Sequence, residues 1–451
     1  MHDTRDTDDD RRRSRDELLG LLADTLSRSP ADETSISWLE VERREVGVRW
    51  RQGKGESPFR RRRNVHVKVL EAGRLGSFRT QATTWGGLER AIRQAMAHAR
   101  AQEKVPGFPR LAGDSSALPD LPELRDAAIR RLDEGAATDE LSRRLREDER
   151  GRLRWGETRL VVVSSRGLRR YAAATEISLE VACGLPRIAG YAARATRSLA
   201  RMPFDKVLDR ARARRGTERQ GEPPSEPSFP IVLAPEATAQ LLDVVNRRSL
   251  TAWDYELGDT FLREFLGVQV FDRSLELVDD ATDPDGLPFP FDMEGTPKRR
   301  VPVIEHGVPR TPALDQFHAA RWGLPATPHA CAGDDARFEH LALAAGDAEM
   351  DALLRAADGG IWIGRLERLE CFEPRRLRIR AVARGCRRIE GGRRTDSVAD
   401  LTWETNLLQA LSHVAAIGHE RTLLTDPSGE LGGIRAPALA LTEATGFRPA
   451  E

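Results

Sequence analysis

The stretch from Pro230 to Gly307 constrains this chain most, because it sets a strand, a helix and a rigid acidic loop close together in the sequence. Pro230–Pro235 is a short apolar run typical of a strand, and Glu236–Arg248 has the apolar spacing of a helix. The loop Asp283–Gly295 holds four acidic residues among three prolines and two glycines, which fix its backbone. We expect function to centre here, although a structural crossover whose acids bind backbone amides explains the loop equally well.

Composition excludes several classes of protein. The 451 residues carry 71 basic and 71 acidic side chains, and this zero balance removes the positive charge of a general nucleic-acid binder. Four cysteines stand far apart without a CxxC pair, which favours a reducing compartment and gives no zinc knuckle. The N-terminal residues are charged or polar without an apolar signal core, and no apolar run is long enough for a membrane span. We expect a cytoplasmic protein.

The chain divides by pattern into an α+β protein of two main units. Residues 1–32 are a charged tail, disordered to about residue 15, with a short helix. Residues 33–215 form a mixed unit, in which Val65, Val67 and Val69 alternate with polar residues as in a half-buried strand and 86–102 is an amphipathic helix. Residues 216–228 are polar and rich in Pro and Gly, which predicts a linker. Residues 229–451 form the second unit.

The second unit is predicted to be rich in strands, as a large antiparallel sheet or a partial barrel. Its expected strands are 230–234, 268–272, 275–279, 361–366, 375–383, 386–391 and 397–403. Its expected helices are 236–248, 311–320, 346–356 and 404–417. In the first unit, 123–148 is expected to be helical, and 160–163 and 176–181 form strands around a turn at Ser165–Gly167.

Searches for catalytic motifs mostly fail. No phosphate-binding GxxxxGK[ST], dinucleotide-binding GxGxxG, GxSxG elbow or HExxH zinc helix occurs. The loose candidates for metal ligands are His306, followed by Asp315 and His318. Asp315 and His318 stand at positions i and i+3, so they can share one face of a helix. The simpler alternative is that His318 only bonds within its own helix.

Several segments, taken in order, resemble the TldD/PmbA (TldD/TldE) family of peptidase subunits, and the resemblance covers roughly residues 33 to 446. Asn64–Thr80 and the following helix are similar to the family's first strand, glycine turn and helix. Leu277–Asp280, Pro290–Pro297 and Val303–Val308 are similar to its "DD…FDdEG.p…i..G.l" run. The segments that complete the resemblance are Val161–Leu168, Glu404–His419 and Ile434–Leu441.

The resemblance implies a heterodimeric peptidase in which TldD-type subunits hold a metal on an HExxxH helix plus a late cysteine. PmbA/TldE-type subunits share the fold but lack these ligands. Here the first His falls at Asp243, the Glu at Val244 and the second His at Arg248, and no cysteine lies between 426 and 433. Arg248 is a permanent cation and Val244 cannot act as a base, so the residues agree with the resemblance.

We therefore predict a PmbA/TldE-like subunit without its own cofactor, paired with a TldD-like chain that carries zinc or a similar metal and cleaves unfolded or modified peptides. Asp292, Glu294, Gly295 and His306 are the candidate contacts with peptide or partner. Neither nucleic acid nor membrane is expected as a partner. Two alternatives stay open. One is a peptidase whose metal site has moved to the acidic loop, His306, Asp315 and His318. The other is a non-enzymatic peptide-binding maturation factor, acting alone or as a homodimer.

Overall fold

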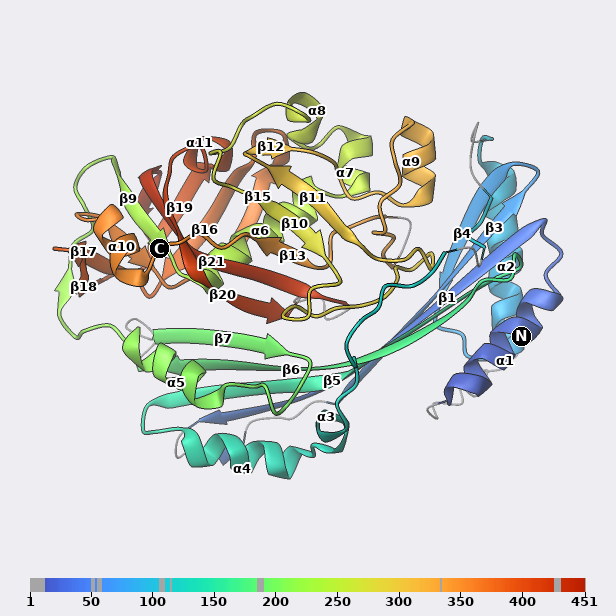
Figure 1. Cartoon of the computed structure of the whole chain (residues 1–451), viewed down its shortest axis with the longest axis horizontal. Coiled ribbons are helices and arrows are strands. Elements are labelled where there is room, and N and C mark those ends of the chain that lie inside the picture. The colour runs from blue at the N-terminus through green and yellow to red at the C-terminus, as the bar shows by residue number, and fades with distance from the viewer. Residues whose placement is uncertain are drawn as a thin grey trace, which may run out of the picture.

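The computed structural model describes residues 13–49, 53–54, 59–104, 110–113, 116–184, 190–332, 335–425 and 431–450. Most of the tail that was predicted to be disordered lies outside these ranges. The described part is an α+β structure built on three sheets, as expected from the sequence. A long curved sheet extends along one side of the molecule, and the other two sheets form a second body against part of it (Figure 1).

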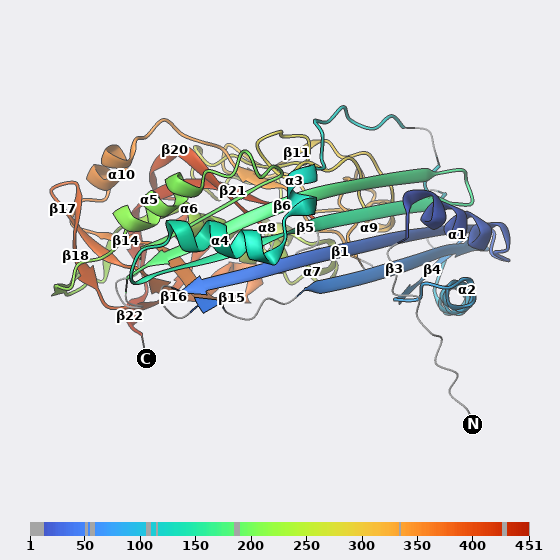
Figure 2. The ribbon, with the colours of Figure 1, turned by 90° about the horizontal axis from the view of Figure 1, so that it is seen from below.

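The first sheet has the strand order β4-β3-β1-β5-β6-β7, all antiparallel, with β2 beside β1. Three of its strands, β1, β5 and β6, are unusually long, so they run along much of the length of the molecule (Figure 2). The turn predicted at Ser165–Gly167 joins β5 to β6. The bounds are β1 Glu33–Arg49, β2 Gly53–Lys54, β3 Arg60–Glu71, β4 Arg74–Thr80, β5 Glu149–Ser164, β6 Arg169–Cys183 and β7 Gly190–Thr196.

Helices cover this sheet in two groups. At one end α1 (Arg15–Ser27) and α2 (Trp85–Ala101) bury leucines, isoleucines and alanines against β1, β3 and β5. At the other end α4 (Glu134–Arg144) and α5 (Phe204–Ala213) pack on β5, β6 and β7, beside the single turn α3 (Ala127–Arg131). Gly76 of β4 lets α2 approach closely, because a Cβ there would lie 2.1 Å from the Ala95 carbonyl oxygen.

The second sheet has the order β12-β11-β10-β13-β21-β9-β14-β17-β18-β8, and β20 pairs with β21. Most of its pairs are antiparallel, but β13–β21, β9–β14 and β8–β18 are parallel. The bounds are β8 Gln220–Gly221, β9 Ser228–Leu233, β10 Leu277–Asp280, β11 Arg300–Glu305, β12 Val308–Pro309, β13 Leu341–Leu343, β14 Ile361–Ile363, β17 Arg387–Glu390, β18 Arg393–Val398, β20 Val414–Thr425 and β21 Gly433–Thr445. The segment predicted as a linker thus contributes β8 to this sheet.

Within the described residues, a third, four-stranded sheet, six α-helices and the 3-10 turn Pro374–Arg376 complete this body. The sheet has the order β15-β16-β19-β22. Its strands are β15 Arg365–Glu373, β16 Arg378–Arg384, β19 Leu401–Asn406 and β22 Phe447–Pro449. The helices are α6 Pro235–Ser249, α7 Ala252–Leu257, α8 Leu262–Phe265, α9 Gln316–Trp322, α10 Met350–Ala356 and α11 Leu407–Ala410.

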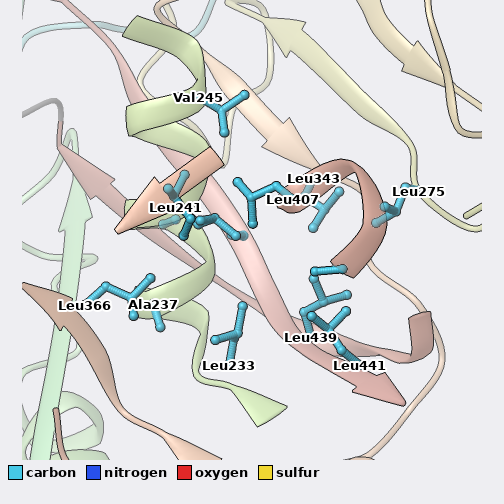
Figure 3. Close-up of a cluster of buried hydrophobic side chains, with 14 of the residues drawn as sticks. Leu233, Ala237, Leu241, Val245, Leu275, Leu343, Leu366, Leu407, Leu439 and Leu441 are labelled. Atoms are coloured by element: carbon cyan, nitrogen blue, oxygen red, sulfur yellow. The ribbon is translucent and has the colours of Figure 1, made fainter. Parts of the chain in front are cut away.

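Helix α6 is the centre of the second body. It follows β9 directly, with Pro235 at its first turn, where a missing N–H costs nothing. Ala237, Leu241 and Val245 point from α6 into a cluster of leucines from β21, β15 and α11 (Figure 3). Each fully buried leucine of this kind contributes about 1.5–3 kcal/mol. Burial on this scale explains why α6 keeps its apolar face independently of which residues occupy its polar positions.

Some predicted elements are wrong. The predicted helix 404–417 is one turn, α11, between two strands, because β19 pairs with β16 as far as Asn406 and β20 pairs with β21 from Val414. The predicted strand 268–272 makes no ladder, since the backbone N–H groups of Val270 and Phe271 donate to the Gly307 carbonyl oxygen instead. The predicted helix 123–148 is split by an extended Leu132, after which Asp133 caps α4.

Candidate functional site

Helix α6 carries the three positions where the resemblance would place metal-site residues. Both carboxylate oxygens of Asp243 accept hydrogen bonds from Arg247, at 2.9–3.0 Å. Val244 packs against the apolar core of the second body. Arg248 is exposed, and it lines a surface groove at the end of the helix. One salt-bridged aspartate, one valine and one arginine do not fit a metal ion, which needs several neutral or anionic donors aimed at one point.

The acidic loop is held in place by its own carboxylates. Asp292 is fully buried, and its oxygens accept from the backbone N–H groups of Glu294, Thr296 and Ala330 at 2.9–3.1 Å. Burial, together with the nearby Glu294 carboxylate, raises the pKa of Asp292 to about 7. Asp292 therefore shapes the loop, and its contact with a peptide stays a prediction.

The same loop is fitted to the first sheet. Gly295 has a φ of +79°, and a Cβ there would lie 2.6 Å from Leu168 Cδ2, in the segment between β5 and β6. Glu294 accepts a hydrogen bond of 2.8 Å from Lys68 of β3. His306 lies apart, in the turn between β11 and β12, where its ring is 75% exposed and bonds Glu276. Glu294 and Gly295 are thus part of the contact between the two bodies, whereas His306 is on the surface.

A buried polar network lies behind the loop, and sequence reasoning missed most of it. Asp279 of β10 bonds His329 Nε2 at 2.9 Å and accepts from the His340 backbone N–H at 2.6 Å. Burial alone would raise the pKa of Asp279. The neighbouring His329, His340 and Lys298 nevertheless hold this pKa well below its usual range. Lys298 also bonds Glu339 at 3.1 Å. The only sequence hint was that Leu277–Asp280 belongs to the family-like run.

The two histidines of this network are neutral at physiological pH. Burial, together with the charge of Lys298, lowers the pKa of His329 to about 4 and that of His340 to about 3. His329 Nδ1 and both ring nitrogens of His340 are buried and have no hydrogen-bond partner among the described residues. The network therefore costs stability, but it leaves neutral imidazoles at the base of the loop.

A second polar cluster faces a surface groove. Asp315 is the N-cap of α9, and its Oδ1 accepts from both the backbone N–H and the ring Nδ1 of His318, at 2.8 and 2.7 Å. Its other oxygen lies 3.6 Å from Lys68 Nζ, which also bonds Glu294. Asp315 and His318 thus come together at the start of α9, as their i, i+3 spacing allows, and this contact is also the one that the simpler alternative of bonding within the helix predicts. The structure brings Glu294 into this cluster but not His306.

Within the ranges that the structure covers, no three or more His, Cys, Asp or Glu side chains are arranged to hold a metal ion. The positions at which a late cysteine was sought, 426–433, are described only from 431 onward. The four cysteines are buried thiols, and burial raises the pKa of Cys183, Cys371 and Cys386. No helix in the described ranges has the length and apolarity of a membrane span.

Comparison with known proteins gives one family and one fold. Residues 226–446 match the family model of the PmbA/TldA metallopeptidase C-terminal domain. No curated protein matches the chain. The matched range covers the second sheet except β8 and the third sheet except β22, and it includes α6 and the acidic loop.

Solved structures share the fold over nearly the whole chain. A proposed modulator of a DNA gyrase from Thermotoga maritima has a TM-score of 0.78 at 19% identity, covering 95% of this chain and 98% of that one. TldE from Thermococcus kodakarensis has a TM-score of 0.77 at 17% identity, covering 95% and 99%. A proposed modulator of DNA gyrase from Bacteroides thetaiotaomicron has a TM-score of 0.73 at 18% identity, covering 96% and 99%. At these identities the likeness shows the fold alone.

Proposed function

Because the chain belongs to the TldD/PmbA family, we propose that it is the PmbA/TldE-like subunit of a TldD/TldE-type peptidase complex. In this complex a TldD-like partner holds the catalytic metal and cleaves unfolded or modified peptides. The present chain holds no metal on α6, and it helps to enclose the peptide. Its buried thiols suit a reducing compartment such as the cytoplasm.

The observation that carries the proposal is the state of α6. Where a catalytic subunit would need two histidines and a glutamate, this helix has Asp243 bound to Arg247, a half-buried Val244 packed against the core, and an exposed Arg248. Arg248 is always protonated and repels a metal cation. Val244 cannot accept a proton from water. The apolar face of α6 remains fully packed, so the helix keeps a structural role without the chemistry.

The strand-rich architecture supports a role in holding peptide. Extended peptides are commonly bound by main-chain hydrogen bonds to the edge of a sheet. Within the described residues, the first sheet ends at β4 and β7, and the second ends at β12 and β8. A role in DNA topology, which the names of two structural relatives mention, gains no support from a chain with zero net charge.

The test is co-expression of a tagged form of this chain with the TldD-like protein of the same genome. We expect the two to co-elute in size exclusion, and peptide cleavage to need both chains. Asp243→Asn in this chain should leave cleavage unchanged, whereas replacing the HExxxH glutamate of the partner should abolish it. If the chains stay apart and the partner cleaves fully by itself, the proposal is wrong. Self-association without any such pairing would instead favour a maturation factor that acts as a homodimer.

A further inference from the structure

A groove of about 740 Å³ opens between the two bodies of the molecule. One wall comes from β3, β4 and α2 of the first sheet, and the other from α7 and α9 of the second body (Figure 1). Lys68, Asp315 and His318 lie in its lining, so the polar cluster described above is open to it. Nothing in the proposed role of α6 uses this groove.

The base of the groove presents an oriented histidine. Burial alone would raise the pKa of Asp315. Lys68 and His318 nevertheless hold this pKa well below its usual range, so Asp315 is ionised. Its carboxylate therefore accepts the Nδ1 proton of His318, which sets the tautomer of the ring. The other ring nitrogen, Nε2, lies 3.8 Å from Glu256 Oε2 on α7. This separation is longer than a hydrogen bond.

Glu256 has one oxygen satisfied and one not. Its Oε1 is 3.1 Å from Arg321 Nη2. Its Oε2 is buried and makes no hydrogen bond with any residue that the structure describes. A buried carboxylate oxygen without a donor is unfavourable. A donor placed about 2.8 Å from Glu256 Oε2 can also reach His318 Nε2, because the two acceptors are 3.8 Å apart.

The charges around this point favour a cationic donor. Glu256, Asp315 and Glu294 bring three negative charges, and Lys68 and Arg321 bring two positive ones, so this described cluster has a net charge of −1. Burial raises the pKa of Asp335, and the charge of the nearby Asp315 raises it further. When ionised, Asp335 adds to the negative potential of the cluster. An apolar surface adjoins the cluster, because Trp253 of α7 is 52% exposed and Phe317 of α9 also lines the groove.

We propose that this groove binds a basic side chain, a lysine ammonium or an arginine guanidinium, of an extended peptide. The cationic group sits between Glu256 Oε2 and His318 Nε2, and the aliphatic stem lies along Trp253. Long basic side chains commonly pack their stems on apolar surface in this way, and an indole face also attracts the cation. The inference rests on the proposed function only in taking a peptide as the ligand, since the groove belongs to this chain alone.

The experiment measures fluorescence anisotropy of two labelled peptides with the purified full chain. The peptides are identical except that one has a central lysine and the other norleucine, which has the same stem without the charge. We expect the lysine peptide to bind at least about tenfold more tightly, the equivalent of one charged hydrogen bond. Equal affinities would overturn the proposal.

Variants then locate the site. Glu256→Gln should abolish the preference for lysine, and Trp253→Ala should weaken both peptides. Glu264→Gln is the matched control, because Glu264 is an exposed acid on α8 outside this groove, and it should change nothing. A preference that survives Glu256→Gln would overturn the proposed site. Co-elution with the TldD-like partner is measured separately. A preference for lysine without pairing would contradict the proposed function alone. Pairing without a preference for lysine would contradict this inference alone.

Discussion

Replacement of Glu236 by glutamine tests how the two bodies are joined. Glu236 lies in the first turn of α6 and is fully buried. Its Oε2 is 2.6 Å from Arg214 Nη1, and its Oε1 accepts from the Ala193 backbone N–H of β7 at 3.2 Å. Arg214 is itself buried, and it shares the Trp362 ring with a second cation, Arg394. Glutamine keeps the shape of the side chain but leaves Arg214 without a counter-charge.

The expected loss is large for a single isosteric change. Removing one partner of a buried ion pair costs about 3–5 kcal/mol, because the remaining charge stays desolvated. The nearby Arg394 adds like-charge repulsion that Glu236 now offsets. The matched control is Glu89→Gln on α2, which breaks the exposed pair of Glu89 with Arg93. Exposed pairs of this spacing contribute only about 0.3–0.5 kcal/mol.

The assay is urea unfolding followed by tryptophan fluorescence and circular dichroism, with the free energy of unfolding compared across the variants. A cycle with Arg214→Met isolates the pair, and the double variant should lose less than the sum of the single variants. An exposed ion pair contributes no more than about 1 kcal/mol. If the free energy of unfolding of Glu236→Gln lies within that amount of the wild-type value, the reasoning about the buried pair is refuted.

Two further predictions concern the core. His340→Leu should make the free energy of unfolding fall less steeply as the pH becomes acid. The folded-state pKa of His340, about 3, lies below its unfolded value of 6.5. The contribution of the neutral imidazole to the free energy of unfolding is therefore complete above pH 6.5 and is lost as the pH falls from there toward 3. Urea titrations from pH 7 to 4 should show the gap between wild type and variant changing with a slope that approaches about 1.4 kcal/mol per pH unit well below pH 6.5, and parallel profiles would contradict this. Gly76→Ala should force α2 away from β4 and lower the melting temperature, since the Cβ would lie 2.1 Å from the Ala95 carbonyl oxygen. The control is Gly86→Ala, where a Cβ has no atom within 4 Å. Equal melting temperatures for the two variants would contradict this prediction.

The sequence predicts what depends on local pattern. The stripe of α2, the strand before α6 and the turn at Ser165–Gly167 all follow from spacing within a few residues. It fails where pairing with distant segments decides. The residues around Leu407 have helical spacing, yet β19 and β20 continue on either side of one turn because β16 and β21 pair with them.

The polar site shows the same limit more sharply. In β3, Lys68 alternates with buried valines, so its position predicts the exposed face of a half-buried strand. It is 7% exposed instead, because the acidic loop covers that face and Glu294, 226 residues farther along the chain, binds it. No local pattern encodes a contact at that separation. Asp315 and His318 were found because their contact is local, at i and i+3, whereas Glu256 was missed because α7 reaches them only in the fold.

The central claim is that this chain belongs to a peptidase complex in which the other subunit holds the metal. The most direct measurement is elemental analysis of the co-purified complex and of each chain purified alone, alongside a chelator-sensitive peptidase assay. The account predicts that metal follows the TldD-like chain, that this chain alone carries far less than one metal per molecule, and that it cleaves nothing alone. A full equivalent of metal on this chain, with cleavage in the absence of the partner, would contradict the account and favour a relocated metal site.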